Sequence, residues 1–353
     1  MAFCLSSSES VDAEVRRVAE ERLDHALLRL RQLPDAEPGQ VEELVHAVRK
    51  RCKELRGLLR LIRPTLGDDF GPTNRAIREA AKQLSSIRDA QALLNTFRDL
   101  RAARFAEDDR GLALDSVYEE QAQRAAVASR TLGEGDPRLA VAYDLLAGVR
   151  EGLADWDVPD GFRAFAPGIE RTYRRGRDGF ARARRKPNDE RIHEWRKAVK
   201  YLWYQMRLIE SVAPSVLGPL VERLDDLAGA LGDDHDLAVL VERLESDPES
   251  FGDRDEVSAA IELSRARQSD LRERAFGLGA RLYAEKPKPF VARMRTYWKI
   301  SRRQGPERRA GSIAELWALD ADHGEDGASL VERERKFLVA DRPEPSVPGD
   351  RIR

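Results

Sequence analysis

The chain has 353 residues, of which 41% are hydrophobic, 7% aromatic and 35% charged, and its 61 Lys and Arg residues are nearly balanced by 63 Asp and Glu residues. This balance excludes a generally basic protein, and two cysteines are too few for a disulfide framework. No segment approaches the roughly 18 to 20 apolar residues of a membrane span, and the first ten residues lack the pattern of a signal peptide. We therefore expect a soluble, cytoplasmic protein.

Apolar residues recur at helical spacing along most of the chain, and Pro and Gly residues separate the segments. The predicted helices span residues 10–33, 38–63, 72–107, 112–131, 137–154, 163–185, 188–212, 216–246, 254–284 and 287–303. The string DWDVPDGFRAFAPG at 155–168 carries two prolines and two glycines, which predicts a boundary between two halves.

The two halves are related by an internal repeat. A shift of 147 residues without gaps aligns ten identical residues of the first half with residues of the second: His46, Arg49, Lys50, Lys53, Leu55, Arg60, Leu61, Ile62, Leu84 and Asp89. Ten identities at one shift in two separate segments indicate a duplication. Asp89 and its equivalent Asp236 are predicted to cap a helix or to orient basic side chains.

This pattern predicts an all-α fold of two pseudo-symmetric four-helix bundles, at 10–155 and 163–305. A polar, Gly-containing linker is expected at 306–330. In VERERKFLV, residues 331–339, charged side chains fall at every second position, which predicts a short β-strand in the remaining segment 331–353. A chance alternation in a disordered tail is the alternative reading.

Basic residues form a stripe on the predicted helix 38–63. On a helical wheel they fall within an arc of roughly 120°. The other side of the helix is apolar. The stripe consists of His46, Arg49, Lys50, Lys53, Arg56 and Arg60.

The second half repeats the stripe on the predicted helix 188–212, with Trp203 in the place of Arg56. This stripe consists of His193, Arg196, Lys197, Lys200, Tyr204 and Arg207. The basic run at 171–186 adds Arg174 and Arg177 to the candidate site and includes Arg171 and Arg175. Residues 171–207 contain 13 Lys and Arg residues but only 4 Asp and Glu residues, so nearby acids cannot neutralise this region.

Two such stripes facing each other across a cleft are expected to bind a linear polyanion. Arg binds phosphate oxygens through two parallel hydrogen bonds, and Lys acts as a mobile point charge. His46 and His193 are expected to donate hydrogen bonds to the polyanion, although a structural role in helix packing is the alternative for both. For each stripe taken alone, a solvated helix face is the simpler reading.

The duplicated motifs HAVRKRCK at 46–53 and HEWRKAVK at 193–200 resemble the signature of the CHAD family, the conserved-histidine α-helical domain. Further likeness lies in LSSIRDAQALL at 84–94, LGDDHDLAVL at 231–240 and LYAEKPKPF at 282–290. The resemblance implies two four-helix bundles and binding of inorganic polyphosphate by the basic residues between them. It also makes polyphosphate-associated proteins and polyphosphate granules expected partners and locations.

The segment VERERKFLV resembles the first strand of the CYTH family of triphosphate tunnel enzymes. That resemblance implies metal ligation by Glu332 and Glu334 only if a complete CYTH domain were present, and too few residues follow for a closed barrel. We therefore expect no catalytic residues, cofactor or metal site in this chain, and a role as the accessory module of a triphosphatase. A metal site in the run from Asp233 to Asp236 is disfavoured, because consecutive residues point in different directions around a helix.

The alternative function is binding of RNA or DNA, because phosphate contacts alone do not distinguish nucleic acid from polyphosphate. Proteins that bind single strands usually place stacking aromatic residues between the basic ones, and the first stripe has none. The sequence therefore favours polyphosphate over nucleic acid.

Overall fold

The computed structural model describes residues 3–85, 92–100, 115–130, 136–251 and 254–304. This part of the chain consists of helices and short connections and contains no β-strand, so the predicted all-α fold is confirmed. The predicted linker at 306–330, the strand segment at 331–353 and Asp89 lie outside the described residues and stay predictions. None of the described helices has the length and apolar character needed to cross a membrane.

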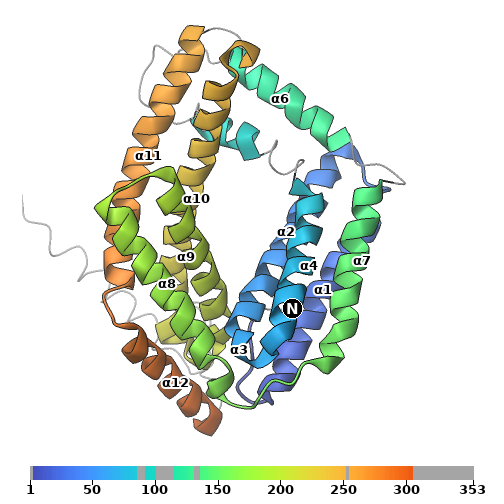
Figure 1. Cartoon of the computed structure of the whole chain (residues 1–353), viewed down its shortest axis with the longest axis vertical. Helices are drawn as coiled ribbons and strands as arrows, with labels where there is room; N and C mark the ends of the chain where they lie inside the picture. The colour runs from blue at the N-terminus through green and yellow to red at the C-terminus, as the bar shows by residue number, and fades with distance from the viewer. Residues whose placement is uncertain (1–2, 86–91, 101–114, 131–135, 252–253, 305–353) are drawn as a thin grey trace, which may run out of the picture. The chain divides into compact units, whose positions relative to one another are not determined.

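Four helices form a bundle in the first half: α1 (Val11–Gln32), α2 (Pro38–Leu61), α4 (Phe70–Gln83) and α7 (Pro137–Glu151). Both α1 and α4 pack against α2 and against α7, so the four helices surround a common core (Figure 1). The short helix α3 (Arg63–Leu66) and the 3-10 turn η1 (Gly67–Asp69) join α2 to α4.

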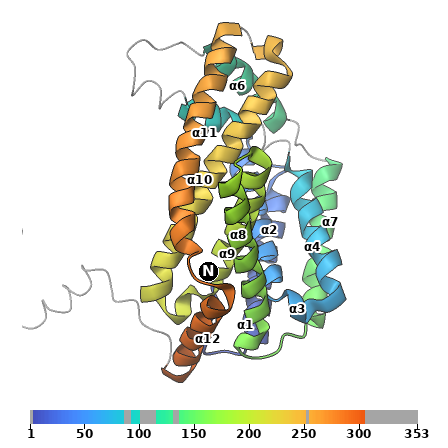
Figure 2. The ribbon, with the colours of Figure 1, turned by 60° about the vertical axis from the view of Figure 1, so that its left-hand side comes forward.

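The second half forms a bundle of α8 (Ala166–Arg185), α9 (Asp189–Ile209), α10 (Pro214–Ser246) and α11 (Arg254–Leu282). Each helix packs against the next, and α11 also contacts α8. The last described helix, α12 (Pro287–Gln304), packs against α8 and against the 3-10 turn η4 (Glu210–Val212) (Figure 2).

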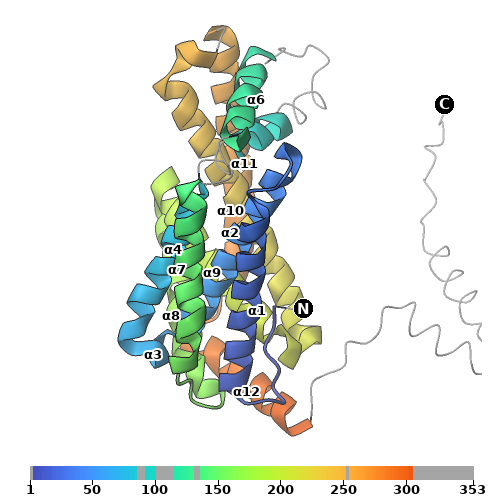
Figure 3. The ribbon, with the colours of Figure 1, turned by 90° about the vertical axis from the view of Figure 1, so that its right-hand side faces the viewer.

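The duplication is not exact. In the first half, α6 (Asp115–Arg130) contacts α2 of its own bundle and also α11 and the 3-10 turn η5 (Pro248–Phe251) of the second (Figure 3). The Arg124 guanidinium lies 4.7 Å from the ring centroid of Phe251 at this contact. In the second half, α10 runs for 33 residues, whereas the described helical residues of the first half at the equivalent place are α4 and 92–100.

The helix boundaries follow from local sequence. Ser10 caps α1 by accepting a hydrogen bond from the Ala13 amide at 3.2 Å, and Asn188 caps α9 by accepting one from the Arg191 amide at 2.9 Å. Proline opens the first turn of α2 and α10, where its missing amide hydrogen costs nothing. The stop and start signals in the sequence therefore place these helices within a few residues of their predicted ranges.

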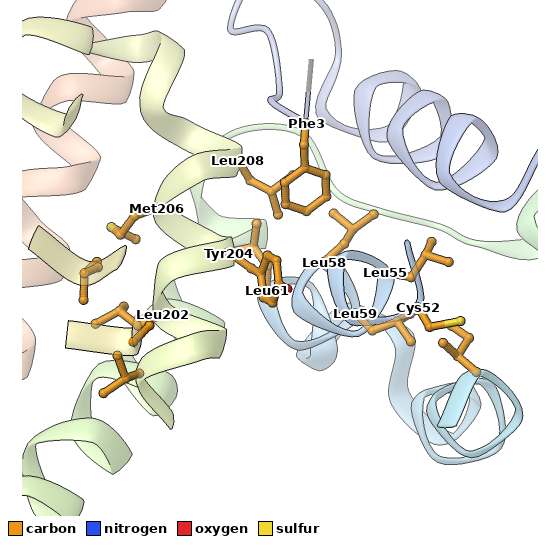
Figure 4. Packing of buried hydrophobic residues seen from close by; sticks show 14 of the residues in the cluster. Phe3, Cys52, Leu55, Leu58, Leu59, Leu61, Leu202, Tyr204, Met206 and Leu208 are labelled. Carbon is orange, nitrogen blue, oxygen red and sulfur yellow. The ribbon is translucent and has the colours of Figure 1, made fainter. Parts of the chain in front are cut away.

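Buried apolar side chains of both halves form one continuous core. Figure 4 shows its central part, where α2 contributes Cys52, Leu55, Leu58 and Leu59. These residues are at most 1% exposed and lie on the face of α2 that the sequence predicted to be apolar. The basic stripe therefore occupies the remaining surface of this helix.

The two bundles meet where α2 packs against α9. A Cβ atom added to Gly57 would lie 2.6 Å from the Cβ of Tyr204, closer than real Cβ atoms approach. Gly57 and Tyr204 are equivalent under the 147-residue shift, so this contact lies where a pseudo-two-fold axis would pass between the halves. Close approach also depends on Gly168 of α8, whose added Cβ would lie 2.0 Å from the Leu61 carbonyl oxygen.

The N-terminal segment, residues 3–10, is hydrogen-bonded to the second half. The Leu5 amide donates to the Leu208 carbonyl at 2.7 Å, and the Ser211 hydroxyl donates to the Leu5 carbonyl at 2.7 Å. The hydroxyl oxygens of Ser7 and Ser301 lie 2.6 Å apart. Phe3 is 5% exposed and Leu5 is fully buried, so this segment is part of the core.

Replacing Gly57 with Ala tests the contact between α2 and α9. The added methyl group would force Tyr204 away from α2, and overpacking of this kind costs about 1 to 3 kcal/mol of unfolding free energy. Chemical denaturation of the variant measures this loss. The matched control is Gly39→Ala in the same helix, where an added Cβ meets nothing within 4 Å. An equal effect of both substitutions would contradict the close contact.

Candidate anion-binding site

The first stripe lies on α2 and divides into two sets. His46, Lys50 and Lys53 are exposed. The arginines instead turn toward α4: Arg49 donates to the Ala81 carbonyl at 2.7 Å. This set therefore holds α4 in place as well as carrying charge.

Asn74 of α4 accepts hydrogen bonds from two more arginines of the first stripe. Its Oδ1 atom accepts hydrogen bonds from Arg56 at 3.2 Å and from Arg60 at 2.9 Å. Asn74 is uncharged, so these bonds fix the two guanidinium groups without neutralising them. Their positive charge remains available to an external anion.

The second stripe lies on α9 in more buried surroundings. Lys197 is paired with Glu194 on the same helix. The Lys200 ammonium lies 5.0 Å from the ring centroid of Trp203, and its pKa is lowered by burial and by the nearby Arg196. Unlike the first stripe, this one therefore has cations that are only partly exposed, and Lys197 has a carboxylate partner.

His193 packs against His235 of α10, with their ring centroids 4.3 Å apart. Burial lowers the pKa of His193, and the neighbouring Lys197 and Arg196 lower it further. Burial lowers the pKa of His235 to about 4, again with help from Arg196. Without a bound anion, both imidazoles are therefore neutral near pH 7.

Tyr204 and Arg207 differ from their predicted placement. The Tyr204 side chain is 6% exposed and lies in the core between α2 and α9, so it is not part of an exposed basic face. Arg207 lies 3.8 Å from the Glu54 carboxylate, which is 1% exposed. Tyr204 is therefore part of the core, whereas Arg207 is 26% exposed, and the prediction that these two residues bind an anion stays a prediction.

Two cations from the predicted stripes do meet, in a pocket between the bundles. Arg60 lines it from α2 and Lys197 lines it from α9. The complete lining, which we call the basic pocket, consists of Arg60, Arg63, Phe70, Arg171, Thr172, Arg175, Lys197, Ala198 and Tyr201.

Aromatic rings support two of its guanidinium groups. The Arg60 guanidinium carbon lies 3.8 Å from the ring centroid of Tyr201, across the contact between the halves. The guanidinium carbon of Arg63 lies 4.4 Å from the ring centroid of Phe70. Such cation–π contacts hold the charge in place without cancelling it.

The cations of the basic pocket repel one another. Burial lowers the pKa of Arg60 to about 10, and the charges of Arg56, Arg175 and Arg63 contribute to the shift. Burial also lowers the pKa of Arg63, with contributions from Arg171 and Arg175. Arginine normally stays charged far above this range, so the shifts indicate positive charge without an internal counter-ion.

Among the described residues, no ion pair is formed by Arg60, Arg63, Arg171 or Arg175. Lys197 is the one pocket cation that has a carboxylate partner within that part of the chain. The basic pocket is therefore suited to an anion with several negatively charged oxygen atoms.

Two predicted candidates from the basic run on α8 lie elsewhere. Arg174 is exposed and paired with Glu170, and Arg177 donates to the Tyr283 carbonyl at 3.2 Å. Arg171 and Arg175 line the pocket instead, four residues apart on one face of α8. The spacing alone does not separate them from Arg174 and Arg177, because residues three apart also neighbour each other on a helix.

Sequence reasoning missed the pocket residues Arg63, Phe70, Thr172 and Tyr201. Arg63 belongs to the separate helix α3 and therefore lies outside the periodic stripe of α2. Tyr201 and Thr172 are single residues without a charge pattern. Only the packing of α8 and α9 against the first bundle brings them together.

A second pocket between the halves is acidic. Residues 92–100 contribute Asp99, and α10 contributes Asp233 and Asp236, with Arg267 of α11 nearby. Burial raises the pKa of Asp233, and Asp236 and Asp99 raise it further. The described residues contain no group of three or more His, Cys, Asp or Glu side chains arranged for a metal ion.

The comparisons with known proteins agree with this architecture. The crystal structure of the CHAD domain from the plant Ricinus communis superposes with a TM-score of 0.57 at 20% identity, over 79% of this chain and 95% of that chain. PptA from Streptomyces chartreusis superposes with a TM-score of 0.55 at 15% identity, over 78% of this chain and 100% of that chain. At these identities the two structures support the fold alone.

A comparison with curated proteins found no match. The family model described as the CHAD domain matches residues 5–70 and residues 21–245. Because the second match covers more than half of the sequence, the chain belongs to the CHAD domain family.

Proposed function

We propose that this chain binds inorganic polyphosphate, with the basic pocket as the centre of the site. The proposal rests on the guanidinium groups that line the pocket and have no ion-pair partner among the described residues. They belong to Arg60, Arg63, Arg171 and Arg175. Membership of the CHAD family implies the same class of ligand. Exposed stripe residues such as Lys50 and Lys53 extend the positive surface along α2.

The aromatic residues of the pocket favour polyphosphate over nucleic acid. Proteins that bind single strands stack bases on open aromatic faces. In the basic pocket, guanidinium groups already cover one face of Tyr201 and one face of Phe70. In the pocket, charge and hydrogen-bond donors therefore dominate, and bases would compete with these guanidinium groups for the rings.

A role as the accessory module of a triphosphatase is a further part of the proposal. It depends on the likeness of residues 331–339 to a CYTH strand, which lies outside the described residues. Association with polyphosphate granules and their proteins depends on polyphosphate binding, so a protein that does not bind polyphosphate would exclude it.

The double substitution Arg171→Gln and Arg175→Gln tests the pocket. Loss of two unpaired guanidinium groups should weaken binding of long-chain polyphosphate about tenfold or more and lower the salt dependence of the binding constant by roughly 1 to 2 in slope. Isothermal titration calorimetry over a salt series measures both.

The matched control for this test is Arg174→Gln with Arg184→Gln. Both residues lie on α8, both are exposed and neither lines the pocket, so the net charge changes equally. Equal losses of affinity in the two double variants would rule out a specific pocket.

Competition binding separates the two candidate ligands. Long-chain polyphosphate should displace single-stranded and double-stranded DNA and single-stranded RNA from the protein at about 0.15 M salt, because guanidinium groups already occupy a face of each of the two aromatic rings in the pocket. Fluorescence anisotropy of labelled nucleic acid measures the displacement. Retention of nucleic acid against excess polyphosphate would favour the alternative function.

The pH dependence of binding tests His193. Lys197 and Arg196 depress its pKa in the free protein, and a polyanion bound to these cations would relieve that effect. The pKa of His193 is then higher in the complex, so binding takes up protons and affinity should increase as the pH falls from about 7.5 to 5.5.

Titration calorimetry at several pH values measures this change. In the variant His193→Gln, which cannot be protonated, the affinity gain at low pH should shrink. An unchanged pH profile in that variant would exclude His193 as a contributor.

A further inference from the structure

The contact between α2 and α9 has two ends. Their residues occupy equivalent positions in the repeat but are not all of the same residue type. Under the 147-residue shift, Arg60 corresponds to Arg207, and Glu54 corresponds to Tyr201. Each arginine reaches the equivalent position on the other helix. Arg60 lies on the Tyr201 ring at 3.8 Å, and Arg207 lies 3.8 Å from the Glu54 carboxylate. The duplication thus produced two related sites, of which one contains a ring and the other a carboxylate.

Glu54 is surrounded by arginines from three helices. Its carboxylate lies 2.5 Å from Arg51 of α2, 3.6 Å from Arg22 of α1 and 3.8 Å from Arg207 of α9. The side chain is only 1% exposed, and a charge buried to this degree is tolerated only when it is paired. Arg51 donates a hydrogen bond to this carboxylate, and Arg22 and Arg207 lie at ion-pair distance, so an anion that belongs to the protein itself occupies a cationic site.

The N-terminal segment covers this second site. The Phe3 ring lies 5.7 Å from the Arg22 guanidinium carbon and 5.4 Å from that of Arg207, and it contacts Tyr204 edge to face at 6.1 Å. Figure 4 shows Phe3 beside Tyr204 and Leu208. The hydrogen bonds of Leu5 described above hold the segment there. The segment therefore restricts access to Arg22, whose side chain is 7% exposed, and to the side of Arg207 that faces the Phe3 ring.

We infer that Glu54 is a built-in anion that fills the second of two related anion sites, among Arg22, Arg51 and Arg207, and thereby closes that site to an external ligand, whereas the basic pocket stays available. The ligand class of the latent site is a polyphosphate or another multivalent oxyanion. Tyr201 and Glu54 are then the residues that decide which of the two sites binds. The inference rests on the proposed function for the ligand class, but not for the existence of the second site.

Glu54→Gln combined with Phe3→Ala tests the inference with tripolyphosphate as the probe. Removing the carboxylate removes the counter-ion that the three arginines share, although Arg22 keeps Glu21 at 3.4 Å, and removing the Phe3 ring widens access to Arg22 and Arg207. Isothermal titration calorimetry should give two tripolyphosphate sites per chain for this variant, against one for the unaltered protein and for Phe3→Ala alone. A folded double variant with a single site would overturn the inference.

Loss of a buried ionic partner is strongly destabilising, so a thermal measurement accompanies the titration. The melting temperature of the double variant Phe3→Ala with Glu54→Gln should fall below that of Phe3→Ala, and tripolyphosphate should raise it by several degrees more than it raises that of Phe3→Ala. An equal or smaller rise would overturn the inference. If the unaltered protein fails to bind polyphosphate at all, the proposed function fails, but this comparison still reports on the second site.

The reciprocal variant, Tyr201→Glu, remains informative if Glu54→Gln does not fold. It places a carboxylate beside Arg60 at the partly exposed position equivalent to Glu54. Tripolyphosphate binding should weaken at least tenfold, without a fall in melting temperature. The matched variant Tyr201→Gln, which lacks the charge, should lose much less affinity. Affinity for Tyr201→Glu equal to that of Tyr201→Gln would overturn the inference.

Discussion

The close approach of α2 and α9 at Gly57 and Tyr204 is the contact on which the rest of the site depends. Without a side chain on Gly57, the two helices come near enough for arginine side chains to reach across to the opposite helix. The contact joins two bundles into one core and brings α3 and α8 to the same pocket. One glycine thus permits a site to which each half contributes cations that neither half could assemble alone.

Positive and negative side chains are nearly equal in number in this chain, but they are concentrated in different places. Like charges three or four residues apart cost a helix a few tenths of a kcal/mol per pair. Here, arginines of α2 offset that cost by donating to Ala81 and Asn74 of α4, which are uncharged acceptors. Near Glu54 the same type of side chain meets a carboxylate instead. The net charge of −2 is therefore compatible with a concentrated positive region in one place.

Much of this arrangement could be predicted from the sequence, because helix periodicity, proline positions and the 147-residue repeat are local or directly countable. A helical wheel, however, shows only which side of one helix is basic, not what the neighbouring helix places opposite. For that reason Tyr204 and Arg207 were assigned to an exposed face, and Arg63 and Tyr201 were missed. The contacts of α6 with the second bundle have no counterpart in the repeat, so the sequence did not predict them either.

The N-terminal segment has a consequence for biosynthesis. Leu5 and Ser7 find their partners at Leu208, Ser211 and Ser301, some 200 to 300 positions later in the chain. The ribosome synthesises the chain from the N-terminus onward. The first bundle can therefore form before the residues that bond to Leu5 and Ser7 have been synthesised. Phe3 and Leu5 are then exposed apolar side chains on the nascent chain until α9 and η4 have emerged, and Ser7 meets its partner only after α12 has been made.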